Sequence, residues 1–346
     1  MGFVVFVTGA AGFIGQAFVV ELLRRGVLET GEGSPRSIES LVLADLAEDI
    51  PVVKGYEKEE RLVRRGGVDI RDKGAFDALL DEYVGDEDML SVFHLGGIAS
   101  GDGERDDRGA DLALDINFLG TRAVMTALRE WNRRTGMQSR FVFTSTNAVF
   151  GPTETITDHS KVMPRTSYGT AKAMCELLIN DWSRRGFLDG RCTRMPAVIP
   201  RTTQNASAAS AWSEVIAKPY DGITADLSVP METFLPVISI FRMMDNLIRL
   251  HNIPDKALGE DRVVVMPALP ITLAEAAAEV EAVFKKHGRP IPTPVASYEE
   301  DPQVAGIVKD WPPQHAVVRA FELGWGVDRS VGEIITLFIE NRSALP

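Results

Sequence analysis

A tyrosine and a lysine stand four residues apart, at Tyr168 and Lys172, and this spacing places both side chains on one face of a helix. A phenol, with an ordinary pKa of about 10, is a weak base at neutral pH, and a neighbouring ammonium stabilises its ionised form. Thr146 stands at the end of an apolar run, and its hydroxyl can hydrogen-bond the substrate oxygen with which Tyr168 exchanges a proton. The three residues therefore predict an acid/base site in which Tyr168 exchanges the proton.

Three glycines, Gly9, Gly12 and Gly15, directly follow the apolar run Phe3–Thr8. Such a turn between a strand and a helix lets the backbone approach a diphosphate, which the helix N-terminus attracts. Asp45 ends the next apolar run, where its carboxylate can accept hydrogen bonds from both ribose hydroxyls and would repel the 2'-phosphate of NADP. The pattern predicts a dinucleotide site that favours NAD over NADP.

The predicted cofactor contacts lie at the ends of the apolar runs and on the helix that carries the tyrosine. They are Gly9, Ala11, Gly12, Phe13, Ile14, Gly15, Asp45, Leu46, Asp69, Ile70, Leu95, Gly96, Gly97, Tyr168, Lys172 and Pro196. Asp69 is placed to meet the adenine amino group, although a purely structural role is equally open. We expect His94 to be a packed strand histidine, and we expect Asp158 and His159, the other candidate bases, to be solvated in a polar loop.

The bulk composition is that of an ordinary globular protein, with 45% hydrophobic and 25% charged residues among 346. A formal net charge of -12 argues against binding to nucleic acid or to an anionic membrane, because both need a basic surface. Cys175 and Cys192 match neither a disulfide framework nor a metal-ligand pattern, so no metal is expected. The sequence shows no signal peptide or membrane-spanning run, and we expect a cytoplasmic protein that acts on a small molecule.

Short apolar runs alternate with segments of helical periodicity along the first half of the chain. The runs predict strands at Phe3–Thr8, Leu41–Ala44, Ser91–Leu95 and Phe141–Thr144. The periodic segments predict helices at Ile14–Arg25, Lys73–Tyr83, Asp115–Arg134 and Tyr168–Arg185. This alternation predicts an α/β protein with a doubly wound parallel sheet, the Rossmann fold. The polar stretch Glu29–Ser40 is expected to be a surface loop.

Periodicity fades after residue 196, which predicts a smaller C-terminal substrate domain. Residues 1–196 are predicted to form the NAD-binding domain, and 197–235 with 269–346 the substrate-binding part. A helix at Ser239–Asn252 and a strand at Arg262–Met266 predict that 236–268 returns to the first domain, and a further helix is expected at Ile271–His287.

Taken in order, the glycine turn, Asp45, His94-Leu95, Asn117, Thr146 and Tyr168-x-x-x-Lys172 resemble the extended short-chain dehydrogenases/reductases of the nucleotide-sugar epimerase type. The resemblance covers nearly the whole chain. It implies a catalytic set of Thr146, Tyr168, Lys172 and Asn117, in which Asn117 supports the proton relay or the active-site helix; a structural capping role for Asn117 is equally open. It also implies a homodimer that pairs the helices of Asp115–Arg134 and Tyr168–Arg185.

A narrower resemblance is carried by residues 98–101, 148–151, 167–169, 194–196 and 205–210. These segments are similar to those of family members that use NAD to oxidise the C2 hydroxyl of a four-carbon sugar acid, such as D-erythronate, to the 2-oxo acid. The resemblance implies substrate contacts from Ser100, Thr146, Asn147, Tyr168, Arg201 and Asn205. Loop or surface roles stay open for Ser100, Arg201 and Asn205. The chain departs from the pattern at Gly96-Gly97, Thr146-Asn147 and Arg201–Thr203, all on the expected pocket wall.

Two other functions share the same motifs. A nucleotide-sugar epimerase or dehydratase would keep its NAD bound and show no net redox change. Its pocket would bind a nucleoside diphosphate, usually through basic side chains, yet Lys218 is the only basic residue from 202 to 229. A non-catalytic protein that senses the dinucleotide is disfavoured, because Thr146, Tyr168 and Lys172 are all present.

Overall fold

The computed structural model describes residues 2–30, 33–53, 55–98, 106–203, 209–289, 295–309 and 311–346. The chain forms two compact units. The first comprises Met1–Val149, Pro164–Arg194 and Leu247–Val264, and the second Phe150–Met163, Met195–Asn246 and Val265–Pro346. Compact units are not the same as binding domains, so the predicted division of roles at residue 196 stays a prediction.

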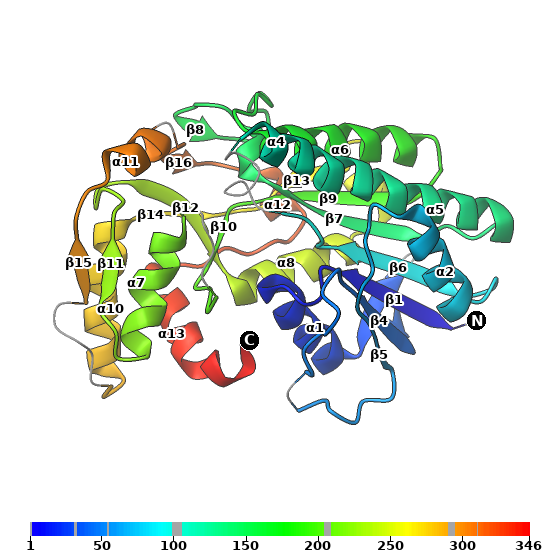
Figure 1. The fold of residues 1–346 in the computed structure, drawn as a ribbon, viewed down its shortest axis with the longest axis horizontal. Helices are drawn as coiled ribbons and strands as arrows, with labels where there is room; N and C mark the ends of the chain where they lie inside the picture. The colour runs from blue at the N-terminus through cyan, green and yellow to red at the C-terminus, as the bar shows by residue number, and fades with distance from the viewer. Residues whose placement is uncertain are drawn as a thin grey trace. The chain divides into compact units, whose positions relative to one another are not determined.

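A seven-stranded sheet forms the centre of the first unit, in the order β13-β9-β7-β6-β1-β4-β5 (Figure 1). Its strands are β1 (Phe3–Thr8), β4 (Ser40–Ala44), β5 (Leu62–Arg65), β6 (Met89–His94), β7 (Arg140–Thr146), β9 (Asp189–Met195) and β13 (Val263–Val265). β1 pairs in parallel with both β4 and β6, so the chain reverses its winding direction there. The carboxyl ends of β1, β6 and β7 meet at one edge, as the register Thr8 to His94 to Phe143 shows. The predicted doubly wound parallel sheet is confirmed.

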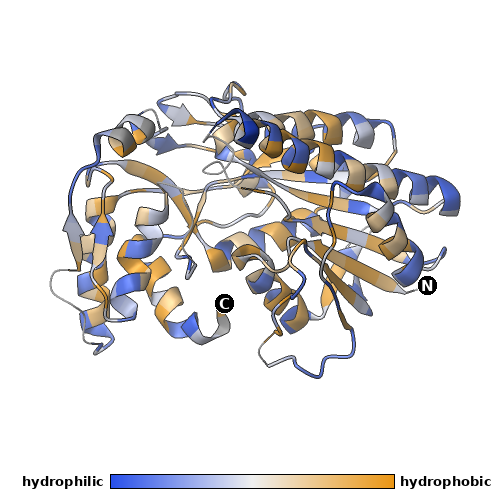
Figure 2. Cartoon of the chain, in the orientation of Figure 1, coloured by the Kyte–Doolittle hydropathy of each residue, from blue (hydrophilic) through white to orange (hydrophobic). Residues whose placement is uncertain are grey.

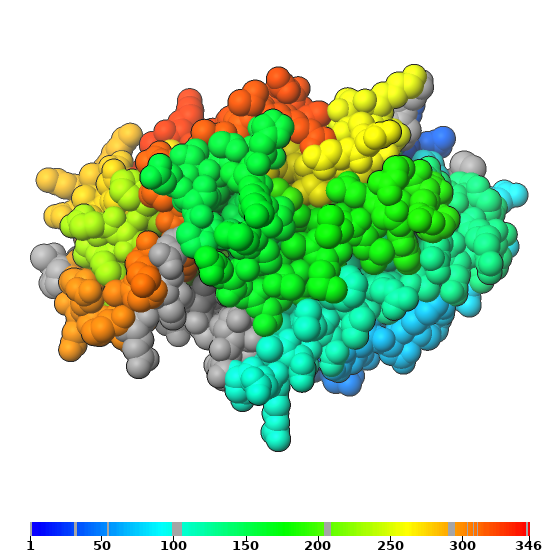
Figure 3. Space-filling view, turned by 90° about the horizontal axis from the view of Figure 1, so that it is seen from above, coloured from blue at the N-terminus to red at the C-terminus, as the bar shows by residue number. Residues whose placement is uncertain are grey.

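Helices connect the strands as crossovers. They are α1 (Phe13–Arg25), α2 (Lys73–Tyr83), α4 (Asp107–Leu114), α5 (Thr121–Thr135), α6 (Ser167–Arg184) and the short α9 (Asp255–Leu258). The helix predicted at Asp115–Arg134 starts earlier, at α4, and residues Asp115–Gly120 form a π-helix, η1. A π-helical turn holds one residue more than an α-helical turn and shifts the spacing of the apolar residues by only one position. Helical periodicity in the sequence therefore does not distinguish it from a continuous α-helix. Figure 3 looks onto the surface to which α5 and α6 contribute, coloured from blue-green to green.

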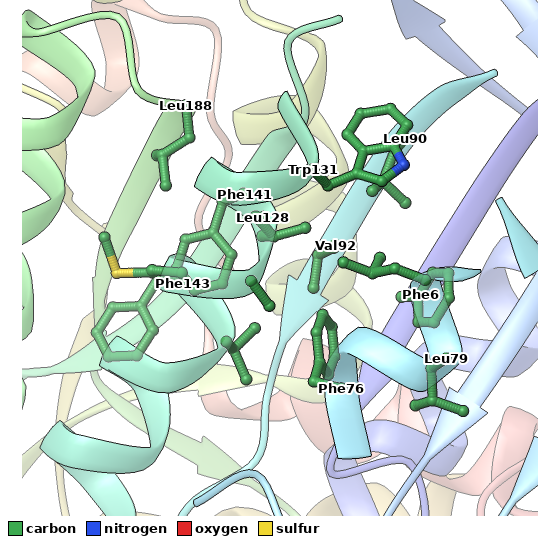
Figure 4. Close-up of a cluster of buried hydrophobic side chains, with 14 of the residues drawn as sticks. Phe6, Phe76, Leu79, Leu90, Val92, Leu128, Trp131, Phe141, Phe143 and Leu188 are labelled. Atoms are coloured by element: carbon green, nitrogen blue, oxygen red, sulfur yellow. The ribbon is translucent and has the colours of Figure 1, made fainter. Parts of the chain in front are cut away.

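Apolar side chains from both the strands and the helices fill the core between them. Figure 2 shows hydrophobic residues along the central strands. Figure 4 shows Phe6 and Val92 of the sheet facing Phe76 of α2 and Leu128 of α5, all fully buried. On the opposite face of the sheet, Phe18 of α1 meets Phe93 of β6 edge to face, with ring centroids 4.7 Å apart. Helices therefore cover both faces, which is why central strands such as β1 and β4 are almost entirely apolar.

The stretch expected to be a surface loop, Glu29–Ser40, instead contains most of an antiparallel hairpin. β2 (Val27–Thr30) pairs with β3 (Ser34–Ser37), and Gly33 beside the turn has a φ of 84°. All four residues of β3 are exposed, so the strand lacks the apolar alternation that would identify it in the sequence. The expectation of a loop was wrong, although the segment does lie at the surface.

The second unit contains three small sheets and several helices. Its strands are β8 (Thr155–Ile156), β10 (Ala197–Ile199), β11 (Ala225–Leu227), β12 (Phe234–Ser239), β14 (Leu269–Thr272), β15 (Ala296–Tyr298) and β16 (Gln314–His315). Its helices are α7 (Ser210–Tyr220), α10 (Leu273–Lys286), α11 (Pro302–Val308), α12 (Arg319–Glu322), α13 (Val331–Asn341) and the first part of α8 (Ile240–Asn252). A short 3-10 turn, η3 (Arg342–Ala344), follows α13, and a second one, η2 (Asn147–Val149), ends the first segment of the first unit. The sequence did not predict α7. The predicted helix at Ile271–His287 starts at Leu273, because Thr272 caps it in a capping box with Glu275.

Of the segment 236–268, predicted to return to the first domain, Leu247–Val264 belong to the first unit and the rest to the second. α8 continues from the second unit into the first, and β13 joins the seven-stranded sheet at its edge. Within the described ranges, no helix is both long and apolar enough to cross a bilayer.

Candidate active site

The backbone packs tightly around Gly9 and Gly15 of the glycine turn, and no side chain caps the start of α1. A Cβ on Gly15 would lie 2.1 Å from the carbonyl oxygen of Gly9, and one on Gly9 would lie 2.6 Å from the backbone nitrogen of Gly96. Gly12 is exposed and occupies the N-cap of α1, with no side chain capping the helix. The first N–H groups of a helix need acceptors, so this terminus can bind an anion such as a diphosphate.

Asp45 is held against the same turn. One of its carboxylate oxygens accepts a hydrogen bond from the Ala11 N–H at 2.9 Å, and the other accepts one from Ala47 at 3.0 Å. The neighbouring Leu46 is 60% exposed. The carboxylate therefore lies where the sequence predicted it, at the end of β4 and beside the glycine turn.

Asp69 follows Val68, whose N–H donates to the carbonyl of Asp45 at 2.8 Å. The Asp69 carboxylate accepts hydrogen bonds from the Arg71 guanidinium at 2.6 and 3.0 Å, and these bonds lower the pKa of Asp69. Ile70 packs against Gly120, where a Cβ would lie 2.9 Å from the Ile70 side chain. Asp69 therefore forms an ion pair with Arg71 and follows the residue that bonds to Asp45. Its predicted contact with adenine stays a prediction.

Lys172 connects α6 to the sheet. Its side chain is buried, and its Nζ donates a hydrogen bond to the carbonyl of Thr144 at 2.9 Å. The same Nζ lies 4.5 Å from the centre of the Phe143 ring and 5.9 Å from that of Tyr168. Helix α6 begins just before Tyr168, because the Thr166 hydroxyl caps it by accepting from the N–H of Gly169 at 3.0 Å.

Tyr168 lies beside the end of β7, which carries Thr146. A Cβ on Gly169 would lie 2.3 Å from the carbonyl of Ala148, so α6 packs directly on η2. The hydroxyl of Thr146 accepts a hydrogen bond from the N–H of Ala148 at 3.1 Å. The predicted residues Thr146, Tyr168 and Lys172 are therefore brought together at the carboxyl edge of the sheet, where ligands of doubly wound folds bind.

Asn117 is fully buried in η1 and faces the segment after β6. Its amide nitrogen donates to the carbonyl of Ile98 at 3.1 Å, and its amide oxygen accepts from the N–H of Ile98 at 3.0 Å. A Cβ on Gly97 would lie 2.5 Å from this amide oxygen and 3.7 Å from the Lys172 Nζ. Only glycine fits there, so Gly97, Asn117 and Lys172 belong to one cluster.

The predicted substrate contacts are more scattered. Asn147 follows Thr146, and within the described part of the chain neither atom of its buried amide has a hydrogen-bond partner. Arg201 belongs to the second unit, where its Nε donates to the carbonyl of Val198 at 3.2 Å. Pro196, a predicted cofactor contact, belongs to the same unit. Ser100 and Asn205 lie outside the described residues.

The two alternative bases differ in surroundings. His159 is exposed, as expected. Asp158 is only half-buried, and its carboxylate accepts hydrogen bonds from the N–H groups of Val318 and Arg319 at 2.7 and 3.1 Å, at the start of α12, so it has a structural role that the sequence did not predict. No group of three or more His, Cys, Asp or Glu side chains that could hold a metal occurs in the described ranges.

The sequence analysis missed a buried ion pair beneath the site. The Glu176 carboxylate accepts hydrogen bonds from the Arg194 guanidinium at 2.7 and 3.1 Å and from the hydroxyl of Ser145. These residues join α6, β9 and β7. The signal was available in part, because Glu176 follows Lys172 by four residues and therefore shares its helix face.

Comparison with known proteins assigns this fold and site to a family. Residues 5–230 match the model of the NAD dependent epimerase/dehydratase family. The chain belongs to this family and is an NAD-dependent oxidoreductase of the extended short-chain dehydrogenase/reductase type, as its motifs predicted.

Two relatives are similar over nearly their whole length. The chain is 35% identical to D-erythronate dehydrogenase of Cupriavidus necator, over 97% of this chain and 98% of the relative. It is 31% identical to D-erythronate dehydrogenase of Haemophilus influenzae, with the same coverage of 97% and 98%. The crystal structure of the nucleoside-diphosphate-sugar epimerase from Agrobacterium tumefaciens is also similar, with a TM-score of 0.85 and 31% identity over 100% of this chain and 96% of that chain. The names of the first two relatives agree with the narrower resemblance seen in the sequence.

Proposed function

We propose that this protein uses NAD to oxidise the C2 hydroxyl of a four-carbon sugar acid like D-erythronate, giving the 2-oxo acid. The observation that carries the proposal is the attachment of Lys172 to the carbonyl of Thr144, which holds the tyrosine helix beside the strand end with Thr146. Similarity to two D-erythronate dehydrogenases over 97% of the chain supports the choice of substrate class.

The residues present fit NAD. The uncapped start of α1 and the exposed Gly12 suit the diphosphate, and Asp45 suits the hydroxyls of the adenosine ribose. NAD, when bound, supplies the acceptor for a hydride from the substrate carbon. Most of the remaining predicted cofactor contacts follow the ends of β4, β5, β6 and β9.

The chemical step requires a base at the substrate hydroxyl. Tyr168 removes the hydroxyl proton, while the Thr146 hydroxyl hydrogen-bonds the same oxygen and orients it. The Lys172 ammonium stabilises the tyrosine anion electrostatically, and it also holds the ribose next to the nicotinamide. Asn117 supports this arrangement by fixing Ile98 and thus the chain beside Gly97.

A sugar acid also needs partners for its carboxylate and its remaining hydroxyls. Asn147 supplies an amide donor and acceptor that no described residue uses, and Arg201 supplies a guanidinium that can pair with a carboxylate. A nucleoside diphosphate would need more positive charge. Lys218, the only basic residue from 202 to 229, is paired with Glu214 at 2.8 Å.

A nucleotide-sugar epimerase with retained NAD is the second candidate, favoured by the similarity to the Agrobacterium epimerase structure. One experiment separates the two. Purified protein is mixed with NAD or NADP and with D-erythronate, D-threonate or L-threonate, and NADH absorbance is followed, with Tyr168→Phe as the control. Turnover with NAD that disappears in the variant supports the dehydrogenase. Silence across the panel, with NAD co-purifying, would favour the epimerase.

We also propose that the protein is a homodimer. Three leucines project from the adjacent elements α4, η1 and α6, with Leu112 40%, Leu119 46% and Leu177 72% exposed. α6 contributes to the surface seen in Figure 3. The homodimer rests on the family resemblance, and a contiguous apolar patch on these neighbouring elements would suit a partner. Light scattering should give twice the chain mass for the wild type and a monomer for Leu177→Glu; a monomeric wild type would refute the dimer.

A further inference from the structure

A continuous chain of hydrogen bonds runs through the imidazole of His94. Its Nδ1 lies 2.7 Å from the hydroxyl oxygen of Thr8, and its Nε2 lies 3.0 Å from that of Thr121. The Thr8 hydroxyl accepts from the backbone N–H of Gly96 at 3.3 Å, and the Thr121 hydroxyl donates to the carbonyl of Asn117 at 2.8 Å. The side chains of Thr8, His94 and Thr121 are completely buried, so water does not complete their hydrogen bonding.

The two ends of this chain of hydrogen bonds determine the position of every proton in it. A carbonyl only accepts, so the single proton of the Thr121 hydroxyl points to Asn117, and Thr121 must accept from the Nε2–H of His94. The neutral ring then has an unprotonated Nδ1, which accepts from the hydroxyl of Thr8. Thr8 in turn accepts from the Gly96 N–H. All bonds point the same way, from Gly96 to Asn117, with no donor facing a donor.

The two ends of this chain of hydrogen bonds contact the same short backbone segment, Gly96 to Ile98. Gly96 packs against Gly9 of the glycine turn, where an added Cβ would lie 2.6 Å from the Gly96 nitrogen. Asn117 uses its whole amide to hold the N–H and the carbonyl of Ile98. The backbone that passes between the glycine turn and Lys172 is thus fixed at both its start and its end.

We infer that His94, as the neutral Nε2–H tautomer, is a positioning residue that couples Asn117 to the backbone of Gly96 and so shapes the floor of the NAD site. The tautomer follows from the hydrogen bonds alone, whereas the effect on NAD rests on the proposed function. No sequence motif points to this role, because a strand histidine is most often a packed core residue.

The surroundings of the ring keep it neutral. Complete burial, together with the nearby Lys172 ammonium, lowers the pKa of His94 to about 3. The ring lies nearly parallel to that of Phe143, with centroids 6.0 Å apart and an angle of 18°. A second proton on Nδ1 would leave the hydroxyl of Thr8 without its acceptor and would place two cations in one apolar site.

The tautomer is tested first, in the protein without NAD. Long-range nitrogen–carbon NMR spectra of the imidazole rings at neutral pH separate the Nε2–H, Nδ1–H and doubly protonated forms. A His94→Phe sample identifies the His94 signals among the five histidines. We expect the Nε2–H form in the wild type. An Nδ1–H or imidazolium signal from His94 would overturn the inference without affecting the proposed function.

The coupling is tested with matched substitutions at Thr121. Thr121→Val keeps the shape but removes the hydroxyl, whereas Thr121→Ser keeps the hydroxyl. Thr193→Val is the control, because the Thr193 hydroxyl is also buried but has no partner in the described chain. We expect Thr121→Val to weaken NAD binding in calorimetry about tenfold, and the other two variants less than about twofold.

Each outcome of the binding experiment is informative. Equal NAD affinities for Thr121→Val and Thr121→Ser would overturn the coupling. A wild type that binds no NAD would instead refute the proposed function, and the NMR result would still decide the tautomer. If Thr121→Val does not fold, Thr8→Val tests the other end of the same chain, with the same expected loss and the same two controls.

Discussion

The Lys172 ammonium lies 5.9 Å from the centre of the Tyr168 ring and donates its hydrogen bond to the sheet, at the carbonyl of Thr144. The backbone of the sheet therefore orients the lysine. Lys172 is a buried cation, since its side chain is only 4% exposed. Burying a charge is energetically unfavourable, and such a cost is typical of a functional site.

The pair predicts unequal losses for substitutions at the two positions. Tyr168→Phe removes the proton acceptor, and we expect kcat with NAD and D-erythronate to fall by about 10²–10⁴-fold. Lys172→Met should lower kcat as well, but it should also raise the KM for NAD, since in the proposed function the ammonium also binds the ribose. Steady-state kinetics with both variants provides the measurement. A Tyr168→Phe enzyme with unchanged kcat would exclude this tyrosine as the base.

Asp45 predicts the choice between NAD and NADP. Asp45→Asn keeps one amide oxygen that can accept from the N–H of Ala11 and loses the charge, so kcat/KM with NADP should rise relative to that with NAD. Asp45→Ala also loses the bond to Ala11 and should weaken both cofactors. The ratio of kcat/KM for the two cofactors should shift toward NADP by about tenfold or more in Asp45→Asn. An unchanged ratio in this variant would mean that the carboxylate does not face the 2'-position.

The fold and the acid/base site could be predicted because they depend on local patterns. Apolar runs, the glycine turn and the spacing of Tyr168 and Lys172 are all contained in short stretches. The pairing of β8 with β16 could not be predicted, because it joins Thr155 to Gln314 across the chain. The helix α7 was missed because the stretch that leads into it is rich in Ser and Ala and Pro219 lies near its end. The hydrogen bonds of His94 are likewise non-local.

His315 predicts how stability depends on pH. Burial lowers the pKa of His315 to about 4, and its Nε2 has no partner in the described ranges. Above pH 6.5 the ring is neutral in both the folded and the unfolded chain. Below pH 6.5 the unfolded chain binds the proton first, so stability is lost as the pH falls from about 6.5 toward 4. For this one group the loss between pH 7 and 4.5 amounts to about 2 kcal/mol.

His315→Gln should remove that contribution. Urea unfolding of both proteins at pH 7 and 4.5 gives the free energy of unfolding of each. The variant should lose about 2 kcal/mol less than the wild type on acidification, a difference that cancels the contributions of the other histidines. Equal losses in the two proteins would show that His315 ionises alike in the folded and unfolded chains.

The Glu176–Arg194 pair predicts a stability effect that depends on which partner is removed. Both side chains are largely buried, at 4% and 11% exposure, so removing one leaves an uncompensated charge. Glu176→Ala should destabilise the protein by about 3–5 kcal/mol. The double variant Glu176→Met with Arg194→Met should cost less than the single change, because no buried charge is left. Thermal or urea unfolding measures both. A double variant that is less stable than Glu176→Ala would argue against an isolated ion pair.

We predict that replacing Asn147 raises the stability of the protein and weakens its recognition of the substrate. Its buried amide makes no hydrogen bond in the described chain, and an unsatisfied buried amide costs about 1–3 kcal/mol. Asn147→Leu should therefore raise the melting temperature of the free protein. If the substrate satisfies this amide, the same variant should lower kcat/KM for D-erythronate by about 10²-fold, because a site that reads a polar group loses most when that contact disappears. Thr193→Val, which removes an equally unpartnered buried hydroxyl in β9, should leave kcat/KM unchanged. A stabilised Asn147→Leu enzyme with full activity would show that this amide is a structural defect and has no part in binding the sugar acid.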